Sequence, residues 1–196
     1  MSKHFTALLA GATVVAAAVC GAGAAQAQDF RLVDEVRLGV LEHDTELGGG
    51  ESKEGGFDIG AELLTSPITQ LSWIGSPRAV FGLQVNSEGY TNMAYAGILA
   101  QKTVADGVFS STDAFYIEGT VGVAYHDGAI DVRLRPEDAE WKSHGSYWVI
   151  RSGFGAGYRV NEHWSVTATF AHISNANLVQ PNQGSNDVGV RVGYRF

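Results

Sequence analysis

Two polar side chains near the C-terminus, His172 and Ser174, have the residue types and the spacing that activated-serine chemistry needs. A serine hydroxyl is a poor nucleophile until a positioned base removes its proton. Just before the pair, apolar Trp164, Val166 and Phe170 alternate with polar residues, which predicts a strand with one apolar face. His172 and Ser174 continue that parity, so both are expected on the apolar face and within reach of each other. The alternative is that they are ordinary polar residues at the end of a strand.

The residues around this pair form two short segments that can be compared with known enzymes. They read His172-Ile173-Ser174-Asn175-Ala176 and Asn182-Gln183-Gly184-Ser185-Asn186. The segments resemble the hallmark of the lipid A 3-O-deacylase family of outer-membrane barrel enzymes, which is His-x-Ser-Asn-Ala in the penultimate strand and Asn-x-Gly-x-Glu before the last. The resemblance is strong here and weak over the earlier strands. It departs from the family at Asn186, where the family has Glu.

This resemblance implies a serine esterase that removes the ester-linked acyl chain at position 3 of lipid A, with no cofactor and no metal. His172 is then the base for Ser174, whose Oγ attacks the ester carbonyl, and water hydrolyses the acyl-enzyme. Asn175 and Asn182 are the candidates for holding the oxyanion or the substrate. Two other functions stay open: a non-catalytic small barrel with a structural or loop-mediated binding role, and a hydrolase of outer-membrane phospholipids.

Asn186 and Asp187 compete for the third catalytic position. Asp187 carries the negative charge that stabilises an imidazolium, but its parity is that of Arg191, which indicates the inside of the barrel. Asn186 shares the parity of Val188 and is expected on the same outer face as His172. A side-chain amide oxygen can accept the imidazole N–H, so Asn186 is preferred and Asp187 is the alternative acid. A glutamate at position 186 is expected to retain or raise activity.

The strands that must position these residues are predicted by alternation after residue 28. Eight runs have about the length that crosses a bilayer at a tilt, and no run is long enough for a transmembrane helix. The fold class is therefore all-β, an eight-stranded antiparallel transmembrane β-barrel of the outer membrane. The runs are residues 34–44, 57–65, 78–86, 90–101, 114–125, 147–158, 164–174 and 187–196. The parity of the fourth run is ambiguous.

One side of these strands carries charged residues and the other does not. A charged side chain facing lipid near the membrane centre costs roughly 2 to 4 kcal/mol, so the charged side must face the lumen. The predicted interior residues are Arg37, Glu62, Glu118, Arg151 and Arg191. In a barrel of this size the lumen is filled by side chains and leaves no wide pore.

An even number of strands places both chain ends in the periplasm, so the loops after odd strands face outward. This predicts long outer loops at residues 45–56, 126–146 and 175–185 and a short periplasmic turn at 159–162. The connection at residues 66–77, which contains Trp73, is long and apolar for a periplasmic turn and fits this scheme poorly.

Composition and the N-terminal sequence indicate where the protein is located. The chain has 196 residues, 13 Lys and Arg and a net charge of −8, which argues against a nucleic-acid partner. Residues 1–27 are predicted to be a signal peptide that ends in Ala25-Gln26-Ala27, and residues 28–196 a single barrel domain. Cys20 is not a lipoprotein acceptor, and the exported chain has no cysteine. The expected partners are lipid A, the membrane and, during biogenesis, the outer-membrane barrel assembly machinery.

Several apparent motifs have simpler explanations. Gly153-x-Gly155-x-Gly157 has no helix after it and fits the inner face of a barrel strand better than a nucleotide loop. Residues 48–53 lack the order of a phosphate-binding loop and are interpreted as a flexible outer loop. His43-Asp44 and His126-Asp127 are expected to be solvated residues at strand ends, and no third metal ligand can be placed beside them.

Overall fold

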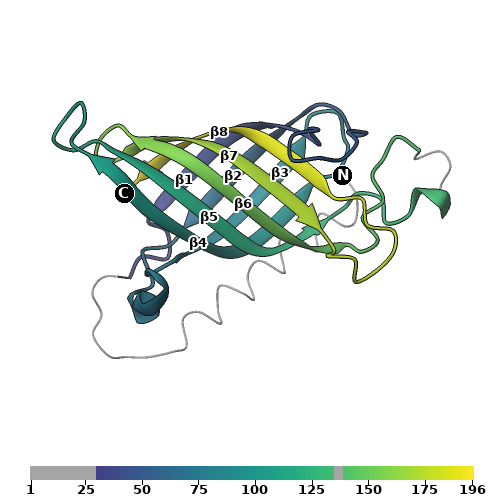
Figure 1. Ribbon diagram of the computed structural model, residues 1–196, viewed down its shortest axis with the longest axis horizontal. Helices are drawn as coiled ribbons and strands as arrows, with labels where there is room; N and C mark the ends of the chain where they lie inside the picture. The colour runs from purple at the N-terminus through teal and green to yellow at the C-terminus, as the bar shows by residue number, and fades with distance from the viewer. Residues whose placement is uncertain (1–29, 135–138) are drawn as a thin grey trace.

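The computed structural model describes residues 30–134 and 139–196 as a closed antiparallel barrel (Figure 1). Each strand pairs with its neighbours in the chain, and the last strand closes the barrel by pairing with the first. The predicted eight-stranded β-barrel is therefore confirmed. The strands are β1 (Glu35–Glu42), β2 (Phe57–Leu64), β3 (Arg78–Asn86), β4 (Met93–Asp106), β5 (Ala114–His126), β6 (Trp148–Arg159), β7 (Trp164–Ser174) and β8 (Ser185–Arg195). The predicted signal peptide lies outside the described residues.

The outer face of the barrel is apolar along most of its height. Leu38, Ile59, Val121 and Phe154 are all at least half exposed, and each alternates with less exposed neighbours along its strand. This is the period-two pattern from which the strands were predicted. An exposed apolar band of this kind is stable only against lipid, as in outer-membrane barrels.

Aromatic side chains gather at both ends of the apolar band. At one end the Tyr125 ring lies 5.9 Å from that of Tyr147 and 5.2 Å from that of Trp148. At the other end the Tyr194 ring lies 5.0 Å from that of Trp164 and 5.3 Å from that of Phe196. Rings that are apolar but carry a polar edge suit the two membrane–water interfaces, so these two clusters mark the height of the bilayer.

The lumen is filled by the charged residues that the sequence assigned to it. Arg37 is 1% exposed, and its guanidinium donates to Glu118 at 2.7 Å and to Glu35 at 2.6 Å. Arg191 lies 3.5 Å from Glu62. Buried charges are stable only when they are paired. These ion pairs therefore explain how the lumen of a small barrel accommodates several charged side chains.

β4 differs from its prediction in both length and pairing. It runs to Asp106, beyond the expected end at residue 101. β3 pairs with β4 only as far as Leu99, whereas β5 follows β4 to the end of the hairpin, so the β4–β5 hairpin extends past the barrel wall. A register shift between Thr103 and Ala105 breaks the alternation there. The ambiguous parity is also decided, since Tyr95 and Leu99 are buried inside.

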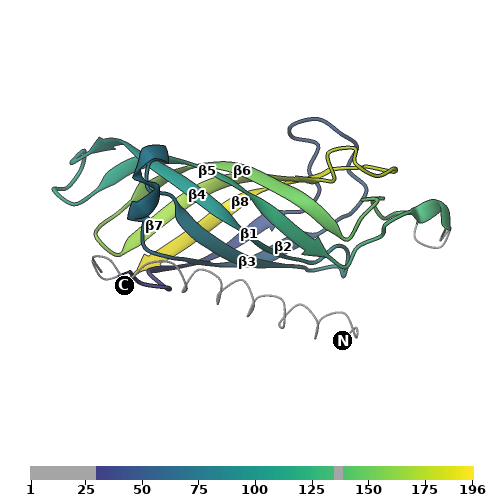
Figure 2. The ribbon, with the colours of Figure 1, turned by 90° about the horizontal axis from the view of Figure 1, so that it is seen from below.

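The long connections gather at one end of the barrel (Figures 1 and 2). They are loop 1 (residues 43–56), loop 3 (127–147) and loop 4 (175–184), with the short loop 2 (87–92) beside them. We call this the loop end. Both termini of the barrel lie at the other end, because Glu35 pairs with Arg195.

The poorly fitting connection between β2 and β3 contains a short 3-10 helix, η1 (Thr69–Ile74), at the end that carries the termini. Trp73 on this helix is 79% exposed. A second short helix, η2 (Val132–Leu134), lies in loop 3. Among the described residues, no helix has the length and apolar character needed to cross a membrane.

Candidate active site

His172 and Ser174 lie on the outward face of β7, close to the loop end. Ile173 between them is 1% exposed and points inward, which confirms the predicted parity. Across the sheet, His172 pairs with Asn186 of β8, and Ser174 pairs with Ile150 of β6. The imidazole and the hydroxyl therefore face the membrane side of the barrel.

His172 is oriented by Asn186. The Nδ1 atom of His172 lies 2.7 Å from the Oδ1 atom of Asn186. An amide oxygen can only accept, so Nδ1 carries the proton and Nε2 keeps a lone pair that can act as a base. Among the described residues, no hydrogen bond joins His172 to Ser174. Such a contact often tightens only when the substrate is bound.

Asn186 is itself held by loop 1. Its Nδ2 atom donates to the carbonyl oxygen of Gly49 at 2.9 Å, and its main-chain oxygen accepts from the N–H of Thr45 at 2.7 Å. Asn186 is 6% exposed in consequence, although its parity is outward. Loop 1 therefore covers the outer face of β8 next to His172.

Asp187 points into the lumen, on the opposite side of the sheet from His172. It is 2% exposed and accepts hydrogen bonds from the main-chain N–H of Asp44 and the side chain of Gln84, at 3.2 and 3.0 Å. Its nearest imidazole is that of His43, at 3.7 Å. Asp187 thus belongs to a different cluster of side chains.

The two other predicted site residues are joined to each other. The main-chain N–H of Asn175 donates to Oδ1 of Asn182 at 2.9 Å, which places Asn182 beside the residue that follows Ser174. The side-chain amide of Asn175 points inward and donates to the carbonyl oxygens of His144, Val179 and Pro181 at 2.8, 2.8 and 3.2 Å. Its N–H groups are therefore engaged in shaping loop 4, and the side-chain amide of Asn182 also donates within this loop, to Oδ1 of Asn177 at 3.2 Å.

Two residues near the site carried no sequence signal for this position, Lys142 and Asp44. The Nζ atom of Lys142 lies 2.8 Å from Oδ1 of Asp44 and donates to the carbonyl of Gly184 at 2.8 Å. Gly184 packs so closely on His172 that a Cβ atom there would come within 2.7 Å of Cε1 of the imidazole. The Lys142–Asp44 ion pair therefore helps to fix Gly184, which packs against the imidazole of His172.

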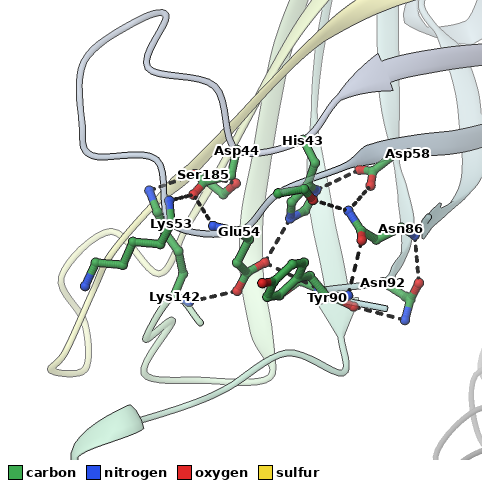
Figure 3. A network of polar contacts seen from close by, with 12 residues as sticks. His43, Asp44, Lys53, Glu54, Asp58, Asn86, Tyr90, Asn92, Lys142 and Ser185 are labelled. Atoms are coloured by element: carbon green, nitrogen blue, oxygen red, sulfur yellow. Dashed lines mark hydrogen bonds and ion pairs between the residues drawn. The ribbon is translucent and has the colours of Figure 1, made fainter. Parts of the chain in front are cut away.

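A buried polar network lies beneath the loops, and Figure 3 shows its members. His43 bridges Glu54 and Asp58, with Nε2 at 2.8 Å from the first and Nδ1 at 3.0 Å from the second. Burial by itself lowers the pKa of His43, but these hydrogen bonds outweigh it and raise the pKa from 6.5 to about 10. The imidazole of His43 is therefore a cation at neutral pH.

The expectation that His43-Asp44 and His126-Asp127 are solvated is wrong for most of these residues. Asp44 and His126 are both 0% exposed, and His43 is 3% exposed. The reason is that loops 1 and 3 fold back over the mouth of the barrel. The sequence could not show this, because a loop carries no periodic signal for what it covers.

His43 also belongs to a group of three possible metal ligands, although Asp44, its neighbour in the sequence, does not. One ligand atom from each of His43, Asp58 and Asp187 lies within 4.8 Å of the others. A protonated imidazole offers no lone pair to a metal ion, and the hydrogen bonds with Asp58 keep His43 protonated. The imidazolium itself acts as the cation of this group.

An apolar surface extends from the His172–Ser174 pair along the outside of the barrel. The rings of Phe154 and Phe170 stack at 5.2 Å between centroids, and Val190 is half exposed on β8. An acyl chain lying in the membrane would contact these side chains while its ester reaches Ser174. The arrangement can thus present a serine, a base and a hydrophobic surface to a lipid.

This chain is similar to a known family in sequence and to a solved structure in fold. The family model described as lipid A 3-O-deacylase (PagL) matches residues 55–195, which include His172, Ser174 and Asn186. The crystal structure of the outer membrane enzyme PagL has a TM-score of 0.60 and 16% identity, covering 83% of this chain and 99% of that chain, and it shows a shared fold.

A second solved structure, the backbone structure of the Yersinia pestis outer membrane protein Ail in a phospholipid bilayer nanodisc, has a TM-score of 0.39 and 10% identity, with coverage of 84% of this chain and 99% of that chain. No curated protein sequence gives a significant match. The match to the family model extends over most of the chain, from loop 1 to the end of β8. This chain belongs to the lipid A 3-O-deacylase family, a family of carboxylic ester hydrolases of the outer membrane.

Proposed function

We propose that this protein is a serine esterase that removes the ester-linked acyl chain at position 3 of lipid A. The observation that carries the proposal is the outward-facing arrangement of Ser174 and His172, with Nδ1 of His172 bound to Asn186 at 2.7 Å. Family membership supplies the substrate class, and the apolar surface beside the site supports a lipid substrate.

The reaction follows from the protonation state of His172. Its Nε2 atom takes the proton of Ser174 as Oγ attacks the ester carbonyl, and the imidazolium then returns that proton to the departing sugar hydroxyl. The acyl-enzyme is hydrolysed by water, which His172 deprotonates in the same way. Asn175 and Asn182 are the candidates for stabilising the oxyanion, and of their donors the side-chain amide of Asn182, which now donates to Oδ1 of Asn177 at 3.2 Å, would have to exchange that partner for the substrate oxygen.

Asn186 orients His172 without adding charge. An amide oxygen keeps the imidazole in the tautomer with a proton on Nδ1, which is the geometric part of the role of a triad acid. The electrostatic part, stabilisation of the imidazolium, is missing. We expect this enzyme to depend on correct orientation more than an enzyme with a carboxylate at this position.

The site lies where a lipid of the outer leaflet can reach it laterally. With the loop end facing outward, His172 and Ser174 lie near the outer interface, because β7 runs toward that end and both residues are close to its last position. Export by the signal peptide at residues 1–27 and insertion by the barrel assembly machinery complete the proposed localisation.

The decisive experiment is mass spectrometry of lipid A from cells that express the protein or its Ser174→Ala variant. We expect loss of one ester-linked acyl chain with the wild type and unmodified lipid A with the variant. His172→Ala should behave in the same way, and the double variant should be little worse than either single one, because the two residues act as a unit. Heat-modifiable mobility on a gel checks that each variant still forms the barrel.

Two results would contradict the proposal. Near-wild-type deacylation by Ser174→Ala would exclude the serine mechanism. Unchanged lipid A together with new lysophospholipids would indicate a phospholipid hydrolase, and no change in either lipid would indicate a non-catalytic barrel.

A further inference from the structure

Loop 1 contacts Asn186 through main-chain atoms. The carbonyl oxygen of Gly49 accepts from Nδ2 of Asn186 at 2.9 Å, and the N–H of Thr45 donates to the main-chain oxygen of Asn186 at 2.7 Å. Asn186 is therefore held by the same loop at its side chain and at its backbone. These contacts join residues far apart in sequence, since 137 positions separate Gly49 from Asn186.

The contact with Gly49 determines which way the Asn186 amide faces. A carbonyl oxygen can only accept a hydrogen bond, so the NH₂ end of the amide must point to Gly49. The oxygen end then faces Nδ1 of His172, at 2.7 Å. A flipped amide would place two donors against each other at His172 or two acceptors against each other at Gly49. One orientation of Asn186 thus selects one tautomer of His172.

We propose that the Gly49 carbonyl is a positioning group of the esterase site, which orients Asn186 and through it keeps the lone pair of His172 on Nε2, the atom that must accept the proton of Ser174. The inference rests on the proposed function and deepens it. It assigns loop 1 a direct part in the reaction, and it explains how an amide can stand where relatives of this chain carry an acid.

The glycines of loop 1 are the residue type that this approach requires. Gly48, Gly49 and Gly50 have φ angles of 89°, 93° and 113°, a backbone region that side chains rarely adopt. A Cβ atom on Gly48 would also lie 2.9 Å from Cζ of Phe170, whereas one on Gly50 would meet nothing within 4 Å. Gly48 is therefore needed for close approach to the outer face, and Gly50 only for its φ angle.

This arrangement also predicts the effect of an aspartate at position 186, which is shorter than the glutamate that is expected to retain or raise activity. Asp has nearly the shape of Asn, but it would place a negatively charged oxygen 2.9 Å from the Gly49 carbonyl, where an N–H now lies. Two acceptors at that distance repel each other. Loop 1 presents an acceptor to position 186, which suits an amide at that position. A family member with a carboxylate there is expected to have a loop 1 of different conformation.

The test is a cycle of substitutions measured in detergent on a lipid A substrate. We expect Asn186→Asp to lower kcat/KM at least tenfold and Gly48→Ala to lower kcat about tenfold with little change in KM. Combining the two should cost less than the product of the single effects, because displacing loop 1 removes the repulsion that the new carboxylate meets. Glu51→Gln, an exposed change in the same loop, is the matched control and should stay within about twofold of wild type.

A second readout separates positioning from general stability. The ¹⁵N chemical shifts of the His172 imidazole report its tautomer, and we expect a proton on Nδ1 in the wild type and a mixture of tautomers in Gly48→Ala.

Asn186→Asp activity equal to or above wild type with loop 1 intact would overturn the inference. So would a Gly48→Ala variant that is inactive but keeps the wild-type tautomer of His172. Should Gly48→Ala fail to form a barrel, the comparison of wild type with Asn186→Asp still decides. Failure of the proposed function is distinct, since it appears as an active Ser174→Ala variant.

Discussion

The side chain at position 186 orients the imidazole of His172, and its neighbour at position 187 points to the opposite face of the sheet. Asn186 accepts from His172 on the outer face, whereas Asp187 is bound inside by Asp44 and Gln84. Adjacent residues of a strand point to opposite faces, so only one of them can serve the site.

We therefore expect Asn186→Ala to lower the turnover of lipid A by about 10²-fold or more, since His172 loses the partner that selects its tautomer. Asp187→Asn should leave turnover within a few fold of wild type, because its contacts lie in the lumen. Single-turnover kinetics of acyl-chain release on both variants measures this. An inactive Asp187→Asn with an active Asn186→Ala would show that Asp187 is the triad acid.

His43 is a buried residue whose charge is stabilised by two carboxylates. Its pKa is raised to about 10 by Asp58 and Glu54, against the opposing effect of burial. A group with a raised pKa stabilises the folded state fully below its unfolded value, here about 6.5, and that contribution is lost as the pH rises toward 10. Glu54 works in the opposite direction, since its pKa is lowered and its contribution is lost in acid.

We expect the barrel to become less stable as the pH is raised from 6.5 to 10. The urea concentration at the unfolding midpoint should decrease over this range, corresponding to a loss of a few kcal/mol in the free energy of unfolding. His43→Gln keeps a hydrogen-bonding side chain but cannot titrate, so it should be less stable at pH 6.5 and show a flatter profile over the same range. An equally steep loss of stability in His43→Gln would assign the effect to another group.

Among the elements, loops 1, 3 and 4 depend on one ion pair. Lys142 of loop 3 and Asp44 of loop 1 are 2.8 Å apart, with side chains that are 5% and 0% exposed, and Lys142 also holds Gly184 of loop 4. Asp44 additionally accepts the main-chain N–H groups of Lys53 and Glu54 at 2.8 and 3.2 Å. Its φ angle of 48° is unusual for a residue other than glycine, which is consistent with strain held by these contacts.

Lys142→Met removes the charge while keeping most of the side-chain volume, and it leaves the carboxylate of Asp44 buried without its cation. We expect the packing of the loop end to weaken by about 3 to 5 kcal/mol, as for other broken buried pairs. Hydrogen exchange at Gly184 and Ser185 measures this, and deacylation should fall with it. Arg133→Gln breaks an exposed pair with Asp131 and should change little.

At the scale of the whole molecule, the fold makes a prediction that is independent of the chemistry. A closed barrel has no free sheet edge around its wall, and its lumen is filled by buried ion pairs. Such a barrel resists detergent until it is heated. We expect the protein to fractionate with outer membranes and to migrate differently on a denaturing gel before and after boiling. Recovery as a soluble periplasmic protein would contradict this.

The sequence by itself determined the barrel and the face on which each residue lies. Side chains alternate with a period of two, and a charge facing lipid is costly, so the strands of Arg37 and Arg191 had only one acceptable orientation. The same rule placed His172, Ser174 and Asn186 together outside and Asp187 inside. Errors arose where the rule stops applying, as in β4 beyond Leu99, where a bulge and a missing partner strand interrupt the alternation.

Only the tertiary structure decided what the loops do. Burial of His43 and Asp44, the ion pair with Lys142 and the contact of Gly49 with Asn186 all join loops to distant parts of the chain. A loop has no repeating pattern from which its contacts could be inferred, and its glycines indicate only that unusual φ angles are possible. The proposed preference for an amide at position 186 therefore rests on the position of one main-chain carbonyl, which becomes known only when loop 1 is folded against β8.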